Sequence, residues 1–126
     1  HLICPMIDAR KQQVYFCFFR QKDGQYLQES DKRVAPPAET VRDISLPCVF
    51  VGNGAELYRQ LIIDELGTLA EFAEDEQHII QASTVARLSL GRFKRQETDE
   101  VHLLVPRYIR KSDAELHLAG VNILKS

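Results

Sequence analysis

The sequence predicts an α/β domain of three layers, in which helices cover both faces of a mixed sheet. Three observations support this class. Apolar, β-rich runs fill the first third of the 126-residue chain, helical spacing dominates the middle, and a short strand leads directly into a helix between them. An antiparallel three-strand meander followed by a strand–helix unit gives a sheet with mixed strand directions.

The meander is expected to begin with a strand at Leu2–Ile7 and to continue with Val14–Arg20. Asp23-Gly24 precedes a third run, Gln25–Glu29, and Asp-Gly between β-rich runs is a strong hairpin signal. Apolar side chains occupy both alternating faces of the second run. That run is therefore expected to be a central strand, covered on both sides.

The strand–helix unit follows a pair of prolines, which favours a short helix at Ala38–Ile44. Pro47–Val51 is expected to be a short buried strand, and Gly52-Asn53-Gly54 a tight turn. Ala55–Leu66 has leucines, isoleucine and tyrosine at helical spacing, and Gly67 supplies the end of that helix.

The last part of the chain opens with an acidic connection at Ala70–Gln77, interpreted as a solvated loop with its acids at 71–76. Ile79–Lys94 is expected to be helical over at least its second part, and Pro106–Arg110 to be extended. A tail follows, with a short helix expected at 113–118. The apolar stripe of the long helix comprises Ala82, Val85, Ala86, Leu90 and Phe93.

Composition excludes several classes of protein. A hydrophobic fraction of 44% argues against a disordered chain, and a net charge of -2 argues against nucleic-acid binding through bulk electrostatics. The longest apolar run, Val14–Phe19, is much shorter than a membrane-spanning helix. Cys4, Cys17 and Cys48 lie in apolar segments, which indicates reduced thiols and a cytoplasmic protein. A chain that enters a core strand directly after His1 is expected to be a piece of a longer protein, although a processed chain would look the same.

No catalytic or metal-binding constellation is predicted. The four histidines include no pair at the three- or four-residue spacing that places two imidazoles on one helix face. No Gly-x-Ser-x-Gly elbow is present, and Cys17 and Cys48 lie within expected strands, where a core thiol is the expected role. The histidines are His1, His78, His102 and His117.

Gly52-Asn53-Gly54-Ala55 is the most suggestive local feature, because it joins a strand to a helix. Glycines at such a junction allow a ligand to approach the backbone, and a helix N-terminus favours a negative group. The same residues more often only shape a turn, and no Gly-x-x-x-x-Gly-Lys phosphate loop is present.

Two charged groups have ordinary structural interpretations. Asp8-Ala9-Arg10 ends the first strand, where the acid and the base are expected to cap the backbone and to pair with each other. Arg107, Arg110 and Lys111 have the charge to meet phosphate, but three cations on a near-neutral chain more often form a solvated edge.

Three stretches together resemble one family, the bacterial TsaB (YeaZ) proteins. Ile7–Tyr15 reads I-D-A-R-K-Q-Q-V-Y and resembles the family signature I-D-A-R-x-x-E-V-Y. Val51–Tyr58 reads V-G-N-G-A-E-L-Y and resembles V-G-x-G-A-x-x-Y. Pro106–Glu115 reads P-R-Y-I-R-K-S-D-A-E and resembles P-x-Y-L-R-x-S-x-A-E. Gln13 departs from the pattern, because it stands where the family often has glutamate.

The resemblance implies a ribonuclease H-like, actin-like ATPase fold. Residues 1–115 would be the C-terminal domain of a TsaB-like protein and residues 116–126 a tail, with the N-terminal half absent. In actin-like folds a turn like Gly52–Ala55 lies near the adenosine of a bound nucleotide, so Gly52, Asn53, Gly54 and Ala55 are the candidate nucleotide-binding residues. The signature residues with structural roles would be Asp8, Arg10, Tyr15, Tyr108 and Arg110.

The function implied by the resemblance is that of a non-catalytic scaffold or activator. Such a protein acts with the catalytic subunit TsaD and the ATPase TsaE to form threonylcarbamoyladenosine beside the tRNA anticodon. It is expected to meet tRNA indirectly and to bind no membrane, and a homodimer is an open alternative assembly. No cofactor is expected on this fragment alone, while ATP or ADP is allowed in the full complex. Two alternatives stay open: half of a nucleotide-binding sugar kinase or ATPase, and an M22-type peptidase (glycoprotease) homologue.

Overall fold

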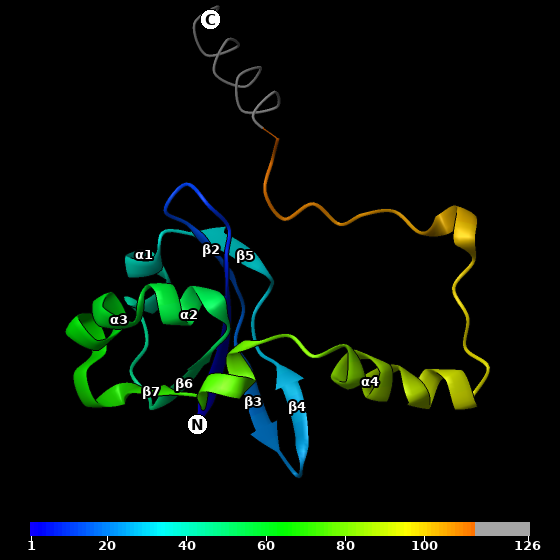
Figure 1. The fold of residues 1–126 in the computed structure, drawn as a ribbon, viewed down its shortest axis with the longest axis horizontal. Helices are drawn as coiled ribbons and strands as arrows, with labels where there is room; N and C mark the ends of the chain where they lie inside the picture. Colours follow the sequence, from blue (N-terminus) through cyan, green and yellow to red (C-terminus); the bar gives the residue numbers. More distant parts are fainter. Residues whose placement is uncertain (113–126) are drawn as a thin grey trace, which may run out of the picture.

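The computed structural model describes residues 1–112. These residues form a mixed sheet with three short helices packed beside it, a long helix that projects away, and an extended segment that returns toward the sheet (Figure 1). The predicted domain end at residue 115, the short helix expected from residue 113 and the tail at 116–126 lie outside the described residues.

The sheet is built around β1 (Leu2–Asp8), which has neighbours on both edges. β2 (Val14–Phe16) and β3 (Phe19–Lys22) pair antiparallel with one edge of β1. β6 (Cys48–Val51) pairs parallel with the other edge. The expected antiparallel meander and the mixed strand directions are therefore confirmed.

The second strand of the meander is interrupted, which the sequence did not predict. β2 and β3 share one register against β1, and continuing that register places Pro5 opposite Cys17. A proline has no N–H to donate, so regular pairing is lost there. Phe18 instead receives an N–H bond from Glu29 (2.8 Å) on its carbonyl and donates its own N–H to Ser30 Oγ (2.9 Å).

The third strand of the meander is also in two parts. β4 (Gln25–Gln28) pairs with β3, and β5 (Arg33–Ala35) pairs with β2. Asp23 and Gly24 join β3 to β4 with φ angles of 51° and 76°, as the two central residues of a tight hairpin turn require. The Asp-Gly hairpin predicted from the sequence is confirmed.

A seventh strand occupies part of the segment interpreted as an acidic loop. β7 (Ala70–Phe72) pairs parallel with β6, and a 3₁₀ turn follows at Asp75–His78. The loop prediction for 71–76 is thus wrong at its start. Ala70 and Phe72 are half-buried and flank exposed Glu71, so the strand pattern is too short to stand out from the acidic run after it.

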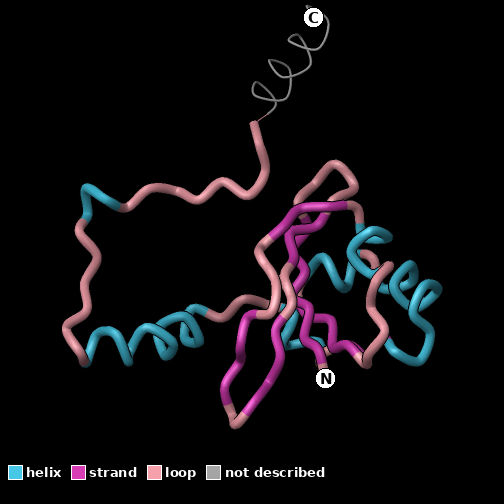
Figure 2. The backbone as a smooth tube through the Cα atoms, turned by 180° about the vertical axis from the view of Figure 1, so that it is seen from behind, coloured by secondary structure: helices cyan, strands magenta, loops and turns pink. Residues whose placement is uncertain are grey.

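Three helices pack on one face of the sheet (Figure 2). α1 (Pro37–Val41) begins at the prolines, as expected, and ends earlier than predicted. The expected long helix is divided into α2 (Asn53–Leu57) and α3 (Arg59–Leu66) by Tyr58, whose φ and ψ of -109° and 19° are not helical. Gly67 ends α3 with a φ of 55°, as predicted.

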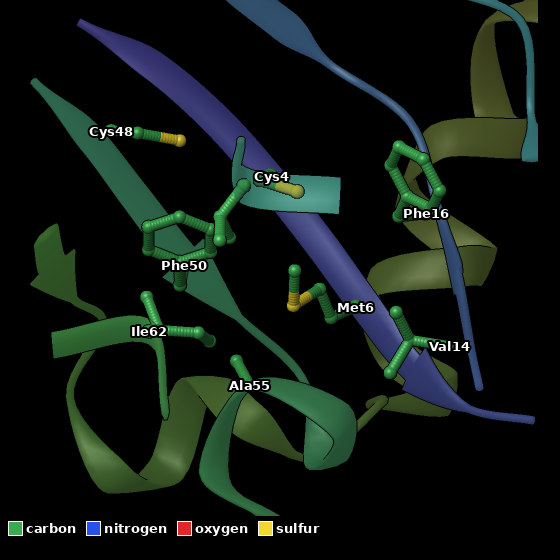
Figure 3. Close-up of a cluster of buried hydrophobic side chains, with 9 residues drawn as sticks. Cys4, Met6, Val14, Phe16, Cys48, Phe50, Ala55 and Ile62 are labelled. Carbon is green, nitrogen blue, oxygen red and sulfur yellow. The ribbon is translucent and has the colours of Figure 1, made fainter. Parts of the chain in front are cut away.

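The hydrophobic core lies between the sheet and these helices (Figure 3). Alternate residues of β1 and β6 point toward the helices, which contribute small and branched apolar groups. The fully buried members are Cys4, Met6, Val14, Val41, Cys48, Phe50, Ala55 and Ile62.

The other face of the sheet has no such cover within residues 1–112. α4 (Ala82–Lys94) is helical as predicted, but all of its residues are exposed, and it projects sideways from the sheet (Figure 1). A hollow of about 970 Å³ lies between α4 and the sheet residues Ile3, Val49 and Val51. The prediction of helices on both faces is therefore wrong for the described part, because periodicity shows which side of a helix is apolar but not what covers it. No helix of this part is both long and apolar enough to cross a membrane.

Burial of the three thiols makes the free energy of unfolding depend on pH in the alkaline range. Burial raises the pKa of Cys4 and Cys17, and it raises the pKa of Cys48 from 9.0 to about 12, with the Glu71 carboxylate adding to the effect. The unfolded chain releases these protons above about pH 9 and the folded protein keeps them, so stability falls as pH rises from 9 toward 12. Urea unfolding at pH 8 and 10.5 should show a loss of about 1 kcal/mol per pH unit for each retained proton.

Cys48→Ala should have a lower stability at pH 8 and a shallower decline between the two pH values. An unchanged unfolding free energy of the parent chain from pH 8 to 10.5 would contradict the prediction.

Candidate functional site

The turns of two signature stretches and Arg110 of the third meet at one corner of the fold. β1 and β6 are parallel neighbours, so the turns that follow them, 9–13 and 52–55, emerge at the same edge of the sheet. Arg110 reaches this edge from the far end of the described chain. We call these residues, 8–13, 52–55 and 110, the strand-end corner.

The turn that follows β1 is left-handed over three consecutive residues. Arg10, Lys11 and Gln12 have φ angles of 61°, 51° and 57°, a conformation that costs about 1 kcal/mol or more per side-chain-bearing residue. Ala9 N–H donates to Gln13 O (2.9 Å), and Asp8 Oδ1 accepts the Arg10 N–H (2.9 Å). The Asp8 carboxylate also lies 3.5 Å from the Arg10 guanidinium. The backbone cap by Asp8 and the ion pair between Asp8 and Arg10, both predicted from the sequence, are therefore confirmed.

The turn that follows β6 packs directly on the backbone of β1. Gly52 has a φ of 105°, and a Cβ added there would lie 2.3 Å from Met6 O. A Cβ on Gly54 would lie 3.0 Å from the carbonyl carbons of Met6 and Ile7. Both glycines are therefore required by close packing. Nucleotide binding by Gly52, Asn53, Gly54 and Ala55 stays a prediction.

Asn53 links the two turns, because its Oδ1 accepts the N–H of Asp8 at 3.1 Å. That N–H belongs to the last residue of β1, where the ladder with β2 ends. The side chain of one signature motif thus satisfies the backbone of another.

His78 hydrogen-bonds the backbone of the same corner, and no signal in the sequence separates it from the other histidines. It is buried, with 4% of its surface exposed. Its Nδ1 accepts the N–H of Gly52 (3.0 Å), and its Nε2 lies 3.1 Å from Ala73 O. Because Nδ1 accepts, the ring proton belongs on Nε2, which donates to Ala73. The imidazole therefore joins the glycine turn to the segment after β7.

Arg110 closes the corner. Its guanidinium donates hydrogen bonds to the carbonyl oxygens of Ala9 (2.7 Å) and Arg10 (3.3 Å) and to Oε1 of Gln13. It also lies 5.8 Å from the centre of the Tyr15 ring, within the range of a cation–π contact. Gln13, the departure from the family signature, thus supplies a neutral acceptor to this cation.

The structure brings together most of the signature residues and leaves one apart. Asp8, Arg10 and Arg110 belong to the strand-end corner, and the Tyr15 ring lies beside it, in contact with Arg110. Tyr108 is 84% exposed. Arg107 and Lys111 are exposed as well, as a solvated edge requires. The solvated-edge prediction is wrong for Arg110, which is half-buried because backbone carbonyls of the turn after β1 accept its hydrogen bonds.

Metal ligands are not gathered in the described chain. Residues 1–112 contain no group of three or more His, Cys, Asp or Glu side chains that could hold a metal ion. His1 pairs with Glu71 (3.5 Å) and His102 with Glu100 (3.2 Å), both on the surface. His117 lies outside the described residues.

This arrangement defines a class of protein, a mixed α/β domain whose fold resembles half of a YeaZ chain. A solved structure described as an uncharacterized protein with similarity to peptidase YeaZ from Pseudomonas aeruginosa matches with a TM-score of 0.62 and 19% identity. The match covers 86% of this chain and 49% of that one. YeaZ from Pseudomonas aeruginosa matches with a TM-score of 0.61 at 20% identity, over 85% and 49% of the two chains.

A relative with higher sequence identity is also known. The chain is 34% identical over 117 residues to the tRNA threonylcarbamoyladenosine biosynthesis protein TsaB of Bacillus subtilis (strain 168). The match takes in 90% of this chain and 49% of TsaB, and no protein-family model matches the chain. The chain is therefore a homologue of the TsaB (YeaZ) family that spans about half the length of its relative. That this is the C-terminal half stays a prediction.

Gly52 provides a test of the packing at the corner. Gly52→Ala should destabilise the fold by about 2–4 kcal/mol, because the new Cβ combines positive-φ strain with a collision against Met6 O. Gly24→Ala is the control, since Gly24 has positive φ but no atom within 4 Å of an added Cβ. It should lose only about 1 kcal/mol in urea unfolding. Equal losses at the two positions would show that the close approach does not matter.

His78 provides a second test. His78→Leu leaves the N–H of Gly52 without its acceptor and should cost about 1–3 kcal/mol of unfolding free energy. The control is His102→Leu on the surface, which should change the stability by less than about 0.5 kcal/mol. If both variants unfold at the parent's urea midpoint, the imidazole bridge is not a support.

Proposed function

We propose that the chain is part of a non-catalytic subunit in the biosynthesis of threonylcarbamoyladenosine in tRNA. The observation that carries the proposal is the 34% identity to a protein of that name, together with the convergence of two signature turns and Arg110 at one corner. The partners proposed for it are a TsaD-like catalytic subunit and a TsaE-like ATPase, in the cytoplasm, with tRNA met indirectly.

The contacts at the strand-end corner support a framework role. The Asp8 carboxylate is engaged by Arg10, the Asn53 amide oxygen accepts an N–H from β1, and both ring nitrogens of His78 have backbone partners. Groups that act in proton transfer or nucleophilic attack must be free to reach a substrate. The polar side chains of this corner instead hold the backbone of the domain in place.

Nucleotide binding is a second candidate, favoured by the position of Gly52–Ala55 at the end of a strand and the start of a helix. ATP or ADP would then be a ligand of the full-length protein or its complex. Calorimetric titration of the full-length protein with ATP separates the two proposals: micromolar binding with phosphoryl transfer to a small substrate favours a kinase or ATPase. The peptidase alternative requires a stoichiometric metal ion and peptide cleavage.

The main proposal is tested in the host organism by deleting the gene that encodes this chain. Mass spectrometry of nucleosides from total tRNA should show loss of threonylcarbamoyladenosine, and a plasmid copy of the full-length gene should restore it. A deletion strain with a normal amount of this nucleoside would rule the proposal out.

A further inference from the structure

The segment between α4 and Arg110 leaves the body of the domain and returns to it at one place. Residues 95–108 are all exposed, and Ile109 and Arg110 are half-buried. In Figure 1 this segment, drawn in yellow and orange, runs outward beyond α4 and back toward the turn between β1 and β2. We call residues 95–109 the strap.

Two features at the return point are unfavourable in free energy. Fixing the end of a loop of this length reduces its conformational entropy. The three left-handed residues of the turn are also unfavourable for side chains that carry a Cβ. The guanidinium of Arg110 contacts both features, because it extends from the end of the strap to the carbonyls of Ala9 and Arg10.

The strength of the Arg110 contact depends on the charge of the side chain that accepts its hydrogen bond. Arg110 hydrogen-bonds the side chain of Gln13, which is an uncharged amide. A carboxylate at the same position would add charge to the hydrogen bond and allow two parallel bonds, which makes such contacts about twice as strong. Gln13 is half-buried, so water screens the interaction less than it would on an open surface.

We propose that Arg110 and Gln13 form a latch that fixes the strap and the left-handed turn together, and that the neutral amide at position 13 keeps the latch releasable. Opening the latch frees residues 9–13 and the strap in one event. The latch is a conformational device of this domain and does not depend on the function proposed above.

Hydrogen exchange and proteolysis of the full-length chain test the two ends of the latch. The amides of Ala9 and Gln13, both hydrogen-bonded within the turn, report on its opening. Tryptic cleavage after exposed Arg107 reports on the strap. Arg110→Gln should speed up amide exchange in the turn and tryptic cleavage of the strap, each about tenfold or more. The reason is that the substitution removes all the hydrogen bonds that the guanidinium donates. Lys111→Gln removes the same charge from an exposed neighbour and should change neither readout.

Gln13→Glu provides the opposite test and remains informative if Arg110→Gln fails to fold. A carboxylate at position 13 should slow exchange at Ala9 and cleavage after Arg107 by about tenfold, and high salt should reverse part of the effect. The latch is refuted if Arg110→Gln loosens the turn but leaves cleavage of the strap unchanged. It is also refuted if Gln13→Glu slows neither readout.

Discussion

The close approach of the glycine turn to β1 is the constraint on which the rest of the structure depends. The space beside Met6 is too small for any side chain at Gly52, and this contact fixes where α2 begins relative to the central strand. α2 and α3 then carry Ala55 and Ile62 into the core. A side chain at Gly52 would push the start of α2 away from β1.

Polar groups at the strand-end corner hold the same geometry from several directions. Asn53 satisfies the last N–H of β1, His78 satisfies the N–H of Gly52, and Arg110 satisfies carbonyls of the left-handed turn. Buried side-chain nitrogen and oxygen atoms of residues 1–112 all have hydrogen-bond partners. These hydrogen bonds all favour the same arrangement of the two turns, because losing one leaves a backbone group without its partner.

The two faces of the sheet have different surroundings, which bears on the proposed role as a subunit. One face is sealed by α1–α3, while the other looks onto a hollow bordered by α4. Ile79, Ile80, Val85 and Leu88 are more than half exposed along that border. Within residues 1–112 these apolar side chains have no helix or strand packed over them. The chain also spans about half the length of the TsaB relative that it matches.

The sequence by itself determined the elements whose signals are local: the Asp23-Gly24 hairpin, the helix start at the prolines, the end of α3 at Gly67 and the helical character of α4. It also located the turns of the strand-end corner through their motifs. Only the tertiary structure decided the interruption opposite Pro5, the pairing of β7, the position of α4 away from the sheet, the role of His78 and the partners of Arg110. The physical reason is distance along the chain. Arg110 meets Ala9 across 101 positions, and no periodicity or propensity encodes a contact of that separation.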